Sequence, residues 1–294
     1  MSKQTNQPKA SFGKQITKLP PVIWMLVIMI AFFSITTENY FSAGNLINIL
    51  RQSVPLMILA FGQTLVILTQ GTDLSLGAQV SFVTVLWIYL TKAGAPIGVA
   101  AVIAVGCTVL AGTINGIVIS KGKVPPFIAT YGMQNILNSI SLLLTTGSSI
   151  YFYHEVFQKV YESKFLLLPV PVWIALMVFG ATWVLLYRTR FGSNIRGLGG
   201  NVEALRLAGV NTAKCYLKTY AYAGLLAGIT GIITACRVES GQPTVGTGWE
   251  FEAVAATLLG GTSLREGNGS RYCDHCHGYV RCVFTCAPTD CSSR

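Results

Sequence analysis

The chain has 294 residues, of which 52% are hydrophobic and only 11% are charged. Soluble domains carry about 25% charged residues, so this composition argues against a soluble domain and predicts a membrane protein. The net charge of +10 does not indicate a nucleic-acid-binding protein, because the Lys and Arg residues lie at the ends of apolar segments rather than in one patch.

Eight apolar segments follow one another along the chain. Most of them approach the roughly 20 residues that a helix needs to cross a bilayer. No cleavable signal peptide is evident, and the polar, basic tail of residues 1–20 runs directly into the first segment. We predict an all-α, polytopic transmembrane helix bundle, with apolar segments at residues 21–36, 54–69, 74–90, 96–120, 126–145, 165–187, 216–236 and 251–264. The Gly- and Ala-rich fourth segment is suited to close helix packing.

The distribution of Lys and Arg between the connections predicts the orientation. With the N-terminus in the cytoplasm, the inner connections (1–20, 70–73, 121–124 and 188–214) hold eleven Lys and Arg residues. The outer connections (37–46, 91–95, 147–164 and 239–248) hold three. Basic residues near span ends resist translocation, so we expect a cytoplasmic N-terminus.

The longest polar interval, residues 188–214, is the first candidate site. It carries five basic residues against a single acid, Glu203. Residues 201–208 are predicted to form a short helix with Asn201 as its N-cap, ended by Gly209. A short amphipathic helix on the cytoplasmic face is typical of a docking element for a partner. The alternative interpretation is an ordinary basic connection between two spans.

Polar residues in or between the apolar segments form a second group of candidates. Such residues normally face a protein interior or a wet cavity, so each is a candidate for a substrate pathway or gate. The alternative is that they form hydrogen bonds with neighbouring helices. Asn135 and Asn138 share a helix face, which favours a shared role. The candidates are Asp73, Ser75, Asn115, Gln134, Asn135, Asn138, Glu250 and Glu252.

Nothing in the sequence indicates an enzyme or a cofactor. The glycine-rich residues 197–200 lack the lysine and the preceding strand of a phosphate-binding loop. No Ser/His/Asp or Cys/His catalytic set is plausible, and His154 is predicted to be a solvated surface residue.

Three motifs resemble one known family, the ribose/xylose/galactose class of ABC importer permeases. Residues 71–77 (GTDLSLG) resemble its Gly-x-Asp-Leu-Ser-x-Gly signature. Residues 191–211 resemble its cytoplasmic loop, in which Glu203, Ala204 and Gly209 keep the EAA-x-x-x-G spacing. Residues 246–264 (GTGWEFEAVAATLLGGTSL) resemble its Gly-x-Glu-x-x-Ala-x-Ala-x-x-Leu-Gly-Gly segment. The motifs occur in the family's order, and the resemblance covers roughly residues 20–270.

The resemblance implies a permease domain over residues 21–270 and about ten spans in a complete chain. It implies the membrane subunit of an importer of ribose or a related sugar in the cell inner membrane. Its expected partners are a cytoplasmic ATPase, a periplasmic sugar-binding protein and a second permease copy. Glu203, Ala204 and Gly209 would then meet the ATPase. The alternatives are a permease of this family for autoinducer-2 or another small solute, and a transporter or channel that needs no ATPase.

The character of the sequence changes after Ser270. Residues 271–294 contain five of the eight Cys and two of the three His residues. A zinc site at Cys273, His275, Cys276 and His277, with Cys282 and Cys286, is disfavoured because the spacing does not match common zinc sites and no apolar core surrounds it. A membrane-anchored zinc protein is therefore only a rival interpretation, and a genuine soluble tail is another.

A shift of reading frame near codon 271 explains this tail better. Read one base later, the codons of residues 272–277 encode only Ile, Thr, Ala, Val and Met, which continue a membrane helix. We therefore expect that the chain lacks its last two spans. Polar groups left without partners in lipid cost several kcal/mol each, so the product is expected to be poorly folded or inactive.

Overall fold

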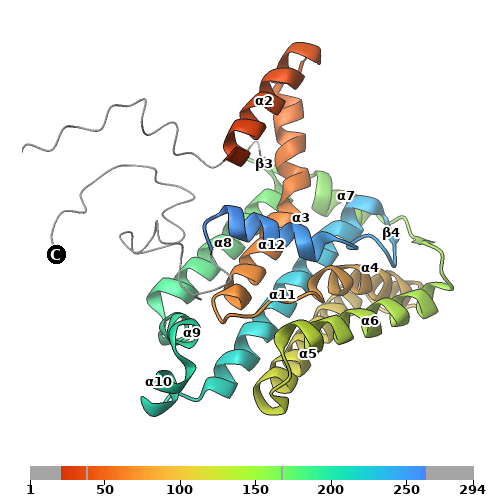
Figure 1. Ribbon diagram of the computed structural model, residues 1–294. Helices are drawn as coiled ribbons and strands as arrows, with labels where there is room; N and C mark the ends of the chain where they lie inside the picture. The colour runs from red at the N-terminus through yellow and green to blue at the C-terminus, as the bar shows by residue number, and fades with distance from the viewer. Residues whose placement is uncertain (1–20, 38, 167, 263–294) are drawn as a thin grey trace, which may run out of the picture. The chain divides into compact units, whose positions relative to one another are not determined.

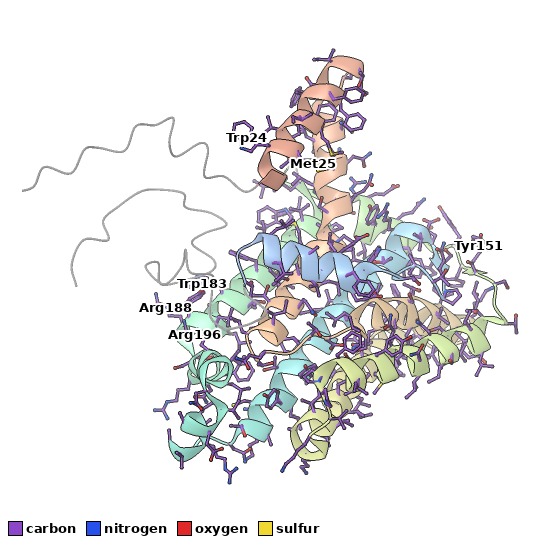
Figure 2. The ribbon with its side chains drawn as sticks, viewed as in Figure 1. Trp24, Met25, Tyr151, Trp183, Arg188 and Arg196 are labelled. Atoms are coloured by element: carbon purple, nitrogen blue, oxygen red, sulfur yellow. The ribbon has the colours of Figure 1, made fainter. Side chains whose placement is uncertain are left out.

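The computed structural model describes residues 21–37, 39–166 and 168–262. The chain forms two structural units, residues 1–50 and 51–294, which are described separately. The first unit contains helix α2 (Pro21–Thr36) and the first turns of helix α3 (Ala43–Ile67). Trp24 and Met25 (Figure 2) begin an α2 surface on which almost every apolar side chain is exposed. An all-round apolar helix of this kind suits a lipid environment.

The described part of the second unit is built almost entirely from helices (Figure 1). Its helices after α3 are α4 (Leu76–Lys92), α5 (Ile97–Gly122), α6 (Pro126–Thr145), α7 (Glu155–Glu162), α8 (Val170–Arg188), α9 (Arg190–Gly200), α10 (Val202–Leu207), α11 (Thr212–Val238) and α12 (Trp249–Leu259). The strands are two residues long: β1 (Ile150–Tyr151) pairs antiparallel with β4 (Ser240–Gly241), and β2 (Lys164–Phe165) with β3 (Leu168–Pro169).

The prediction of an all-α membrane bundle is confirmed. A helix occupies each of the eight predicted apolar segments. Four of the described helices, α3, α5, α8 and α11, are long and apolar enough to cross a membrane, and α4 is a shorter apolar helix. The predicted eighth segment differs most, because α12 has only 11 residues within the described part of the chain. That length is well below the roughly 20 residues of a membrane span.

Helix α4 is the centre of the second unit. Every residue from Leu76 to Val85 is buried, because α5, α6, α11 and α12 all pack against this helix. The two-residue sheet of β1 and β4 lies near its C-terminal half, where Thr84 Oγ1 donates to the carbonyl oxygen of Gln242 at 3.2 Å. A helix that is buried on all sides has no lipid-facing stripe, which explains why its sequence shows little periodicity.

Helices α5 and α11 approach each other closely through glycines. A Cβ at Gly116 would lie 2.6 Å from Leu217 Cα, and a Cβ at Gly228 would lie 2.7 Å from Thr108 Oγ1. Gly112 and Gly224 are likewise pressed against backbone carbonyls of the facing helix. Small residues four apart allow this contact in lipid, where packing replaces the hydrophobic effect as the source of stability. The close packing predicted for the fourth segment is therefore confirmed.

Five of the eight predicted connections are grouped as the charge count predicts. Residues from the predicted inner connections at 70–73, 121–124 and 188–214 surround one cavity. The predicted outer connections at 147–164 and 239–248 instead pair with each other through β1 and β4.

Two short helices, α7 and α9, were not predicted. His154 is exposed, as expected, and its Nδ1 accepts a hydrogen bond from the Val156 backbone N–H at the start of α7.

Candidate functional site

The connection between α3 and α4 folds around a buried carboxyl group, that of Asp73. Its Oδ1 accepts a hydrogen bond from the Ser75 backbone N–H at 2.9 Å and another from Ser75 Oγ at 2.6 Å. Its Oδ2 is buried and has no hydrogen-bond partner among the described residues. Burial raises the pKa of this carboxyl to about 6, although the hydrogen bonds from Ser75 lower it. The carboxyl can therefore change its charge near neutral pH.

Ser75 joins this carboxyl to two neighbouring amides. Its Oγ accepts hydrogen bonds from Gln79 Nε2 at 2.8 Å and from Asn115 Nδ2 at 3.1 Å. The structure thus brings together three predicted candidates, Asp73, Ser75 and Asn115, and adds Gln79. We call these four buried residues the α4 cluster. Gln79 was not predicted, although it lies four residues after Ser75 and so on the same helix face.

A second buried carboxyl group lies against the first turn of α4. Glu250 is only 2% exposed, and its Oε1 accepts a hydrogen bond from Gln134 Nε2 at 3.0 Å. A Cβ at Gly77 would collide with Glu250 Oε2. The partial positive charge of a helix N-terminus favours a carboxylate in this place. Gln134 and Glu250 therefore link α6 and α12 at the start of α4.

The other predicted polar candidates lie in different surroundings. Asn135 is exposed and donates to the Tyr131 carbonyl oxygen of its own helix at 2.9 Å. Asn138 is half-buried, and Glu252 is exposed. Thr130, which was not predicted, is buried and accepts a hydrogen bond from the Leu74 backbone N–H at 3.2 Å. Asn115 and Gln134 form hydrogen bonds between helices, whereas Asp73 bonds to Ser75 within one connection. A role in a substrate pathway stays a prediction.

The predicted docking helix is α10, and its ends are capped as expected. Asn201 Oδ1 accepts a hydrogen bond from the Ala204 backbone N–H at 3.0 Å. After the helix, Gly209 adopts φ +79°, a left-handed conformation that favours glycine. The Gly209 and Val210 backbone N–H groups donate to carbonyl oxygens of the last turn, at 3.0 and 3.2 Å. These bonds form a Schellman ending, which satisfies carbonyls that would otherwise have no partner.

None of the six residues of α10 is buried. Leu207 is 82% exposed, although it is a large apolar residue. Glu203 and Arg206 form an ion pair at 3.8 Å with both side chains about two-thirds exposed or more, and such a pair contributes little stability. Glu203, Ala204 and Gly209 therefore all face away from the packed part of the unit. The surface of α10 is free to contact another molecule.

Helix α9 attaches this exposed helix to the rest of the unit. Its Ile195 is fully buried in an apolar cluster with Leu65 and Leu68 at the end of α3 and Leu186 on α8. Figure 2 shows two basic side chains in this region, Arg188 and Arg196. Their guanidinium groups lie over aromatic rings of α8, at 5.7 Å from the Trp183 centroid and 5.4 Å from the Tyr187 centroid.

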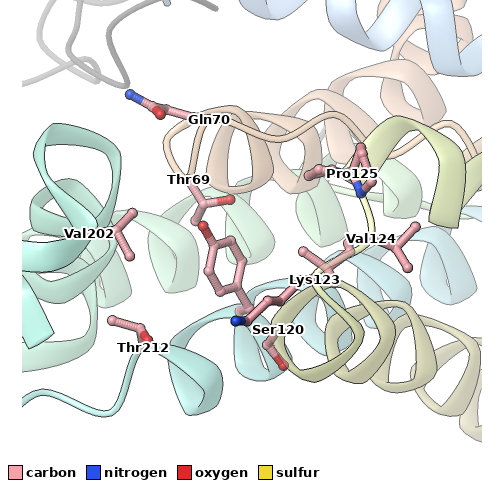
Figure 3. Close-up of a pocket in the computed structure, with 11 residues that line it drawn as sticks. Thr69, Gln70, Ser120, Lys123, Val124, Pro125, Val202 and Thr212 are labelled. Carbon is pink, nitrogen blue, oxygen red and sulfur yellow. The ribbon is translucent and has the colours of Figure 1, made fainter.

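A cavity of about 350 Å³ lies where α10, the start of α11, the end of α3 and the α5–α6 connection meet (Figure 3). No acidic side chain lines it. Its lining residues are Thr69, Gln70, Ile119, Ser120, Lys123, Val124, Pro125, Pro126, Val202, Thr212 and Tyr216. The predicted docking helix is therefore packed on its α9 side and open on its cavity side.

Among the described residues, no group of three or more His, Cys, Asp or Glu side chains could hold a metal ion. The zinc ligands considered in the sequence, Cys273, His275, Cys276 and His277, lie outside the described residues.

The family model described as "Branched-chain amino acid transport system / permease component" matches residues 45–270. The chain is 38% identical to the ribose import permease protein RbsC of Escherichia coli (strain K12) over 275 residues, which cover 92% of this chain and 85% of that protein. It is 36% identical to RbsC of Bacillus subtilis (strain 168), covering 90% and 83% of the two chains. It is 32% identical to the galactofuranose transporter permease protein YtfT of Escherichia coli (strain K12), covering 90% and 79%. No solved structure matches the chain.

Proposed function

The chain belongs to the family of permease components of branched-chain amino acid transport systems, and on this premise we propose that it is the membrane-spanning subunit of an ATP-driven sugar importer. The proposed substrate is ribose or a related monosaccharide. Relatives named for ribose and galactofuranose, each covered over more than two-thirds of its length, support this choice. Autoinducer-2 or another small solute is the alternative substrate.

The chain itself is a transport subunit and not an enzyme, as its permease family implies. A separate cytoplasmic ATPase would supply the energy, because the sequence has no phosphate-binding loop of its own. A sugar-binding protein outside the cell inner membrane would deliver the substrate, and a second permease copy would complete the pathway. The N-terminus and residues 188–214 would then be cytoplasmic.

The observation that carries this proposal is the exposed α10, which keeps the motif residues Glu203, Ala204 and Gly209 on one free surface. In the proposed mechanism, α10 sits in a groove of the ATPase. Closure of the ATPase pair on ATP moves α10 and shifts the spans from inward-open to outward-open. Such a shift requires a ligand with different affinities for the two states, and ATP and the loaded binding protein supply it.

Reconstitution in liposomes tests the mechanism, with the reading frame restored after codon 270 because the present chain is expected to be inactive. Gly209→Arg should leave membrane insertion intact but abolish ATP-dependent sugar uptake and copurification of the ATPase. Gly147→Arg is the matched control, because Gly147 also has a positive φ, +81°, and nothing within 4 Å of an added Cβ, but lies in a predicted outer connection. Normal uptake by Gly209→Arg would refute the docking assignment. Uptake by the parent chain without any ATPase would instead favour a self-sufficient transporter or channel.

Two further measurements address the orientation and the tail. Labelling of a cysteine introduced at position 207 from the outside of intact cells would refute the cytoplasmic orientation.

Residues 271–294 lie beyond the family match and outside the described residues. We propose that they are the product of a frame shift. Sequencing of the gene would refute this if no apolar segment is encoded downstream in another frame, and stoichiometric zinc in the purified chain would favour a metal-binding tail.

A further inference from the structure

Gln70 forms a hydrogen bond between two segments that lie 129 residues apart in the sequence. Its Nε2 donates to the carbonyl oxygen of Gly199, in the last turn of α9, at 2.6 Å. Gly199 itself is buried. Because α10 begins only three residues later, this bond holds the base of the proposed docking helix against the end of α3.

The backbone of Gln70 is in a conformation that few residues adopt. Its φ is +60°, in the left-handed region, where a side chain with a Cβ is disfavoured and glycine is not. A non-glycine residue in such a place is retained when its surroundings favour it, and such residues concentrate at functional sites. The local turn alone would favour glycine at position 70, so the contact of the Gln70 side chain with Gly199 is the feature that favours glutamine there.

The residues that follow Gln70 lead directly to the α4 cluster. A Cβ at Gly71 would lie 2.5 Å from Tyr220 Oη, so the backbone at Gly71 is pressed against α11. Two residues later, Asp73 accepts its hydrogen bonds from Ser75. On the other side of Gln70, Leu65 and Leu68 pack against Ile195 of α9. A short, packed stretch of chain therefore connects α9 with the start of α4.

We propose that Gln70 is a positioning residue that couples movement of α10 to the buried start of α4. This inference rests on the proposed function, in which an ATPase moves α10. The hydrogen bond keeps α9 and the 70–75 connection together. The cavity beside Val202 gives α10 room to move on the side away from α9 (Figure 3). Without the bond, α10 would move with less effect on Asp73 and Ser75.

The experiment compares Gln70→Gly with Thr146→Gly. Both positions have a positive φ, +60° and +51°, so glycine relieves backbone strain in both. Thr146 follows the last residue of α6, directly before a predicted outer connection, and among the described residues its hydroxyl bonds to the neighbouring Thr145 carbonyl alone. Hydrogen exchange is measured on the complete chain in detergent. Gln70→Gly should speed exchange about 2- to 10-fold, the factor expected for one hydrogen bond, in both residues 195–201 and residues 72–79. Thr146→Gly should change neither segment.

Transport gives the second readout. In liposomes with the ATPase and the binding protein, Gln70→Gly should lower the sugar transported per ATP by a similar factor while the thermal unfolding midpoint is kept or rises. A merely structural role would lower the midpoint instead. An unchanged transport ratio, or faster exchange in only one of the two segments, would overturn the role of Gln70. Failure of a chain with its reading frame restored after codon 270 to transport would contradict the proposed function, whereas failure of the present chain is what the proposed frame shift predicts. The exchange result would still decide whether Gln70 links the two segments.

Discussion

The α4 cluster and α10 form their hydrogen bonds in opposite ways. In the α4 cluster, Ser75 bonds to Asp73 before α4, to Gln79 in α4 and to Asn115 in α5. All four residues of the cluster are buried. Helix α10 satisfies its ends with its own neighbours, Asn201 and Gly209, and buries nothing. Because the network joins residues of different helices, those helices must move together to keep its hydrogen bonds. A helix that is capped by its own neighbours can move without losing its hydrogen bonds. This difference fits the proposal that α10 docks to a partner and that the helices around the α4 cluster respond to its movement.

The largest effect should follow from breaking the centre of the α4 cluster. Ser75→Ala removes a hydroxyl that donates to Asp73 and accepts from both Gln79 and Asn115. Asp73 keeps the hydrogen bond from the Ser75 backbone N–H, whereas the Gln79 and Asn115 amides lose their partner. Each buried group left without a partner costs about 1–3 kcal/mol, so we expect a loss of at least about 2 kcal/mol. The thermal unfolding midpoint in detergent measures it. Ser193→Ala, at an exposed position of α9, should change the midpoint little, and a similar small change for Ser75→Ala would mean that the cluster does not hold the unit together.

A smaller but clear effect is expected where α4 meets the loop before α12. A Cβ at Gly77 would collide with Glu250 Oε2 and with the Gly246 carbonyl oxygen. Overpacking of this kind costs about 1–3 kcal/mol, so Gly77→Ala should lower the unfolding midpoint.

The matched control is Gly98→Ala in α5, where nothing lies within 4 Å of the added Cβ. Alanine favours a helix over glycine by about 1 kcal/mol, so this variant should be neutral or stabilised. Equal effects of the two substitutions would argue against the close contact at Gly77.

The smallest global effect should come from α10. Asn201→Ala removes the side chain that caps the helix, which costs about 1 kcal/mol of helix stability. Because α10 buries no residue, this loss should stay local: exchange of the α10 amides should rise about 5-fold, while the unfolding midpoint is unchanged. A marked fall in the midpoint would show that α10 is part of the packed body, and the comparison would fail.

Much of this fold could be predicted because the features concerned are local. The apolar segments predict the helices, since a helix in lipid must satisfy its backbone within one stretch of sequence. Asn201 and Gly209 predict the bounds of α10, because both caps act within a few residues. The grouping of the connections followed from the count of Lys and Arg.

The candidate site could be predicted only in part. Asp73, Ser75 and Asn115 are unusual residues for a membrane helix bundle and were found for that reason. Asn135 and Glu252 look equally unusual in sequence but are exposed, because the side of a helix that faces the interior depends on its neighbours. Gln70 gave no signal at all, since its partner lies 129 residues away and its left-handed φ is invisible in a sequence.

The sequence by itself determined which stretches are helical, which of the described connections lie together and how α10 is capped. Each of these depends on the chemistry of neighbouring residues or on the total charge of a connection. Only the tertiary structure decided that Ser75 meets Asn115, that Glu250 lies against Gly77 and that Gln70 reaches Gly199. Such contacts join distant parts of the chain, and they are set by the packing of whole helices rather than by any residue's preference.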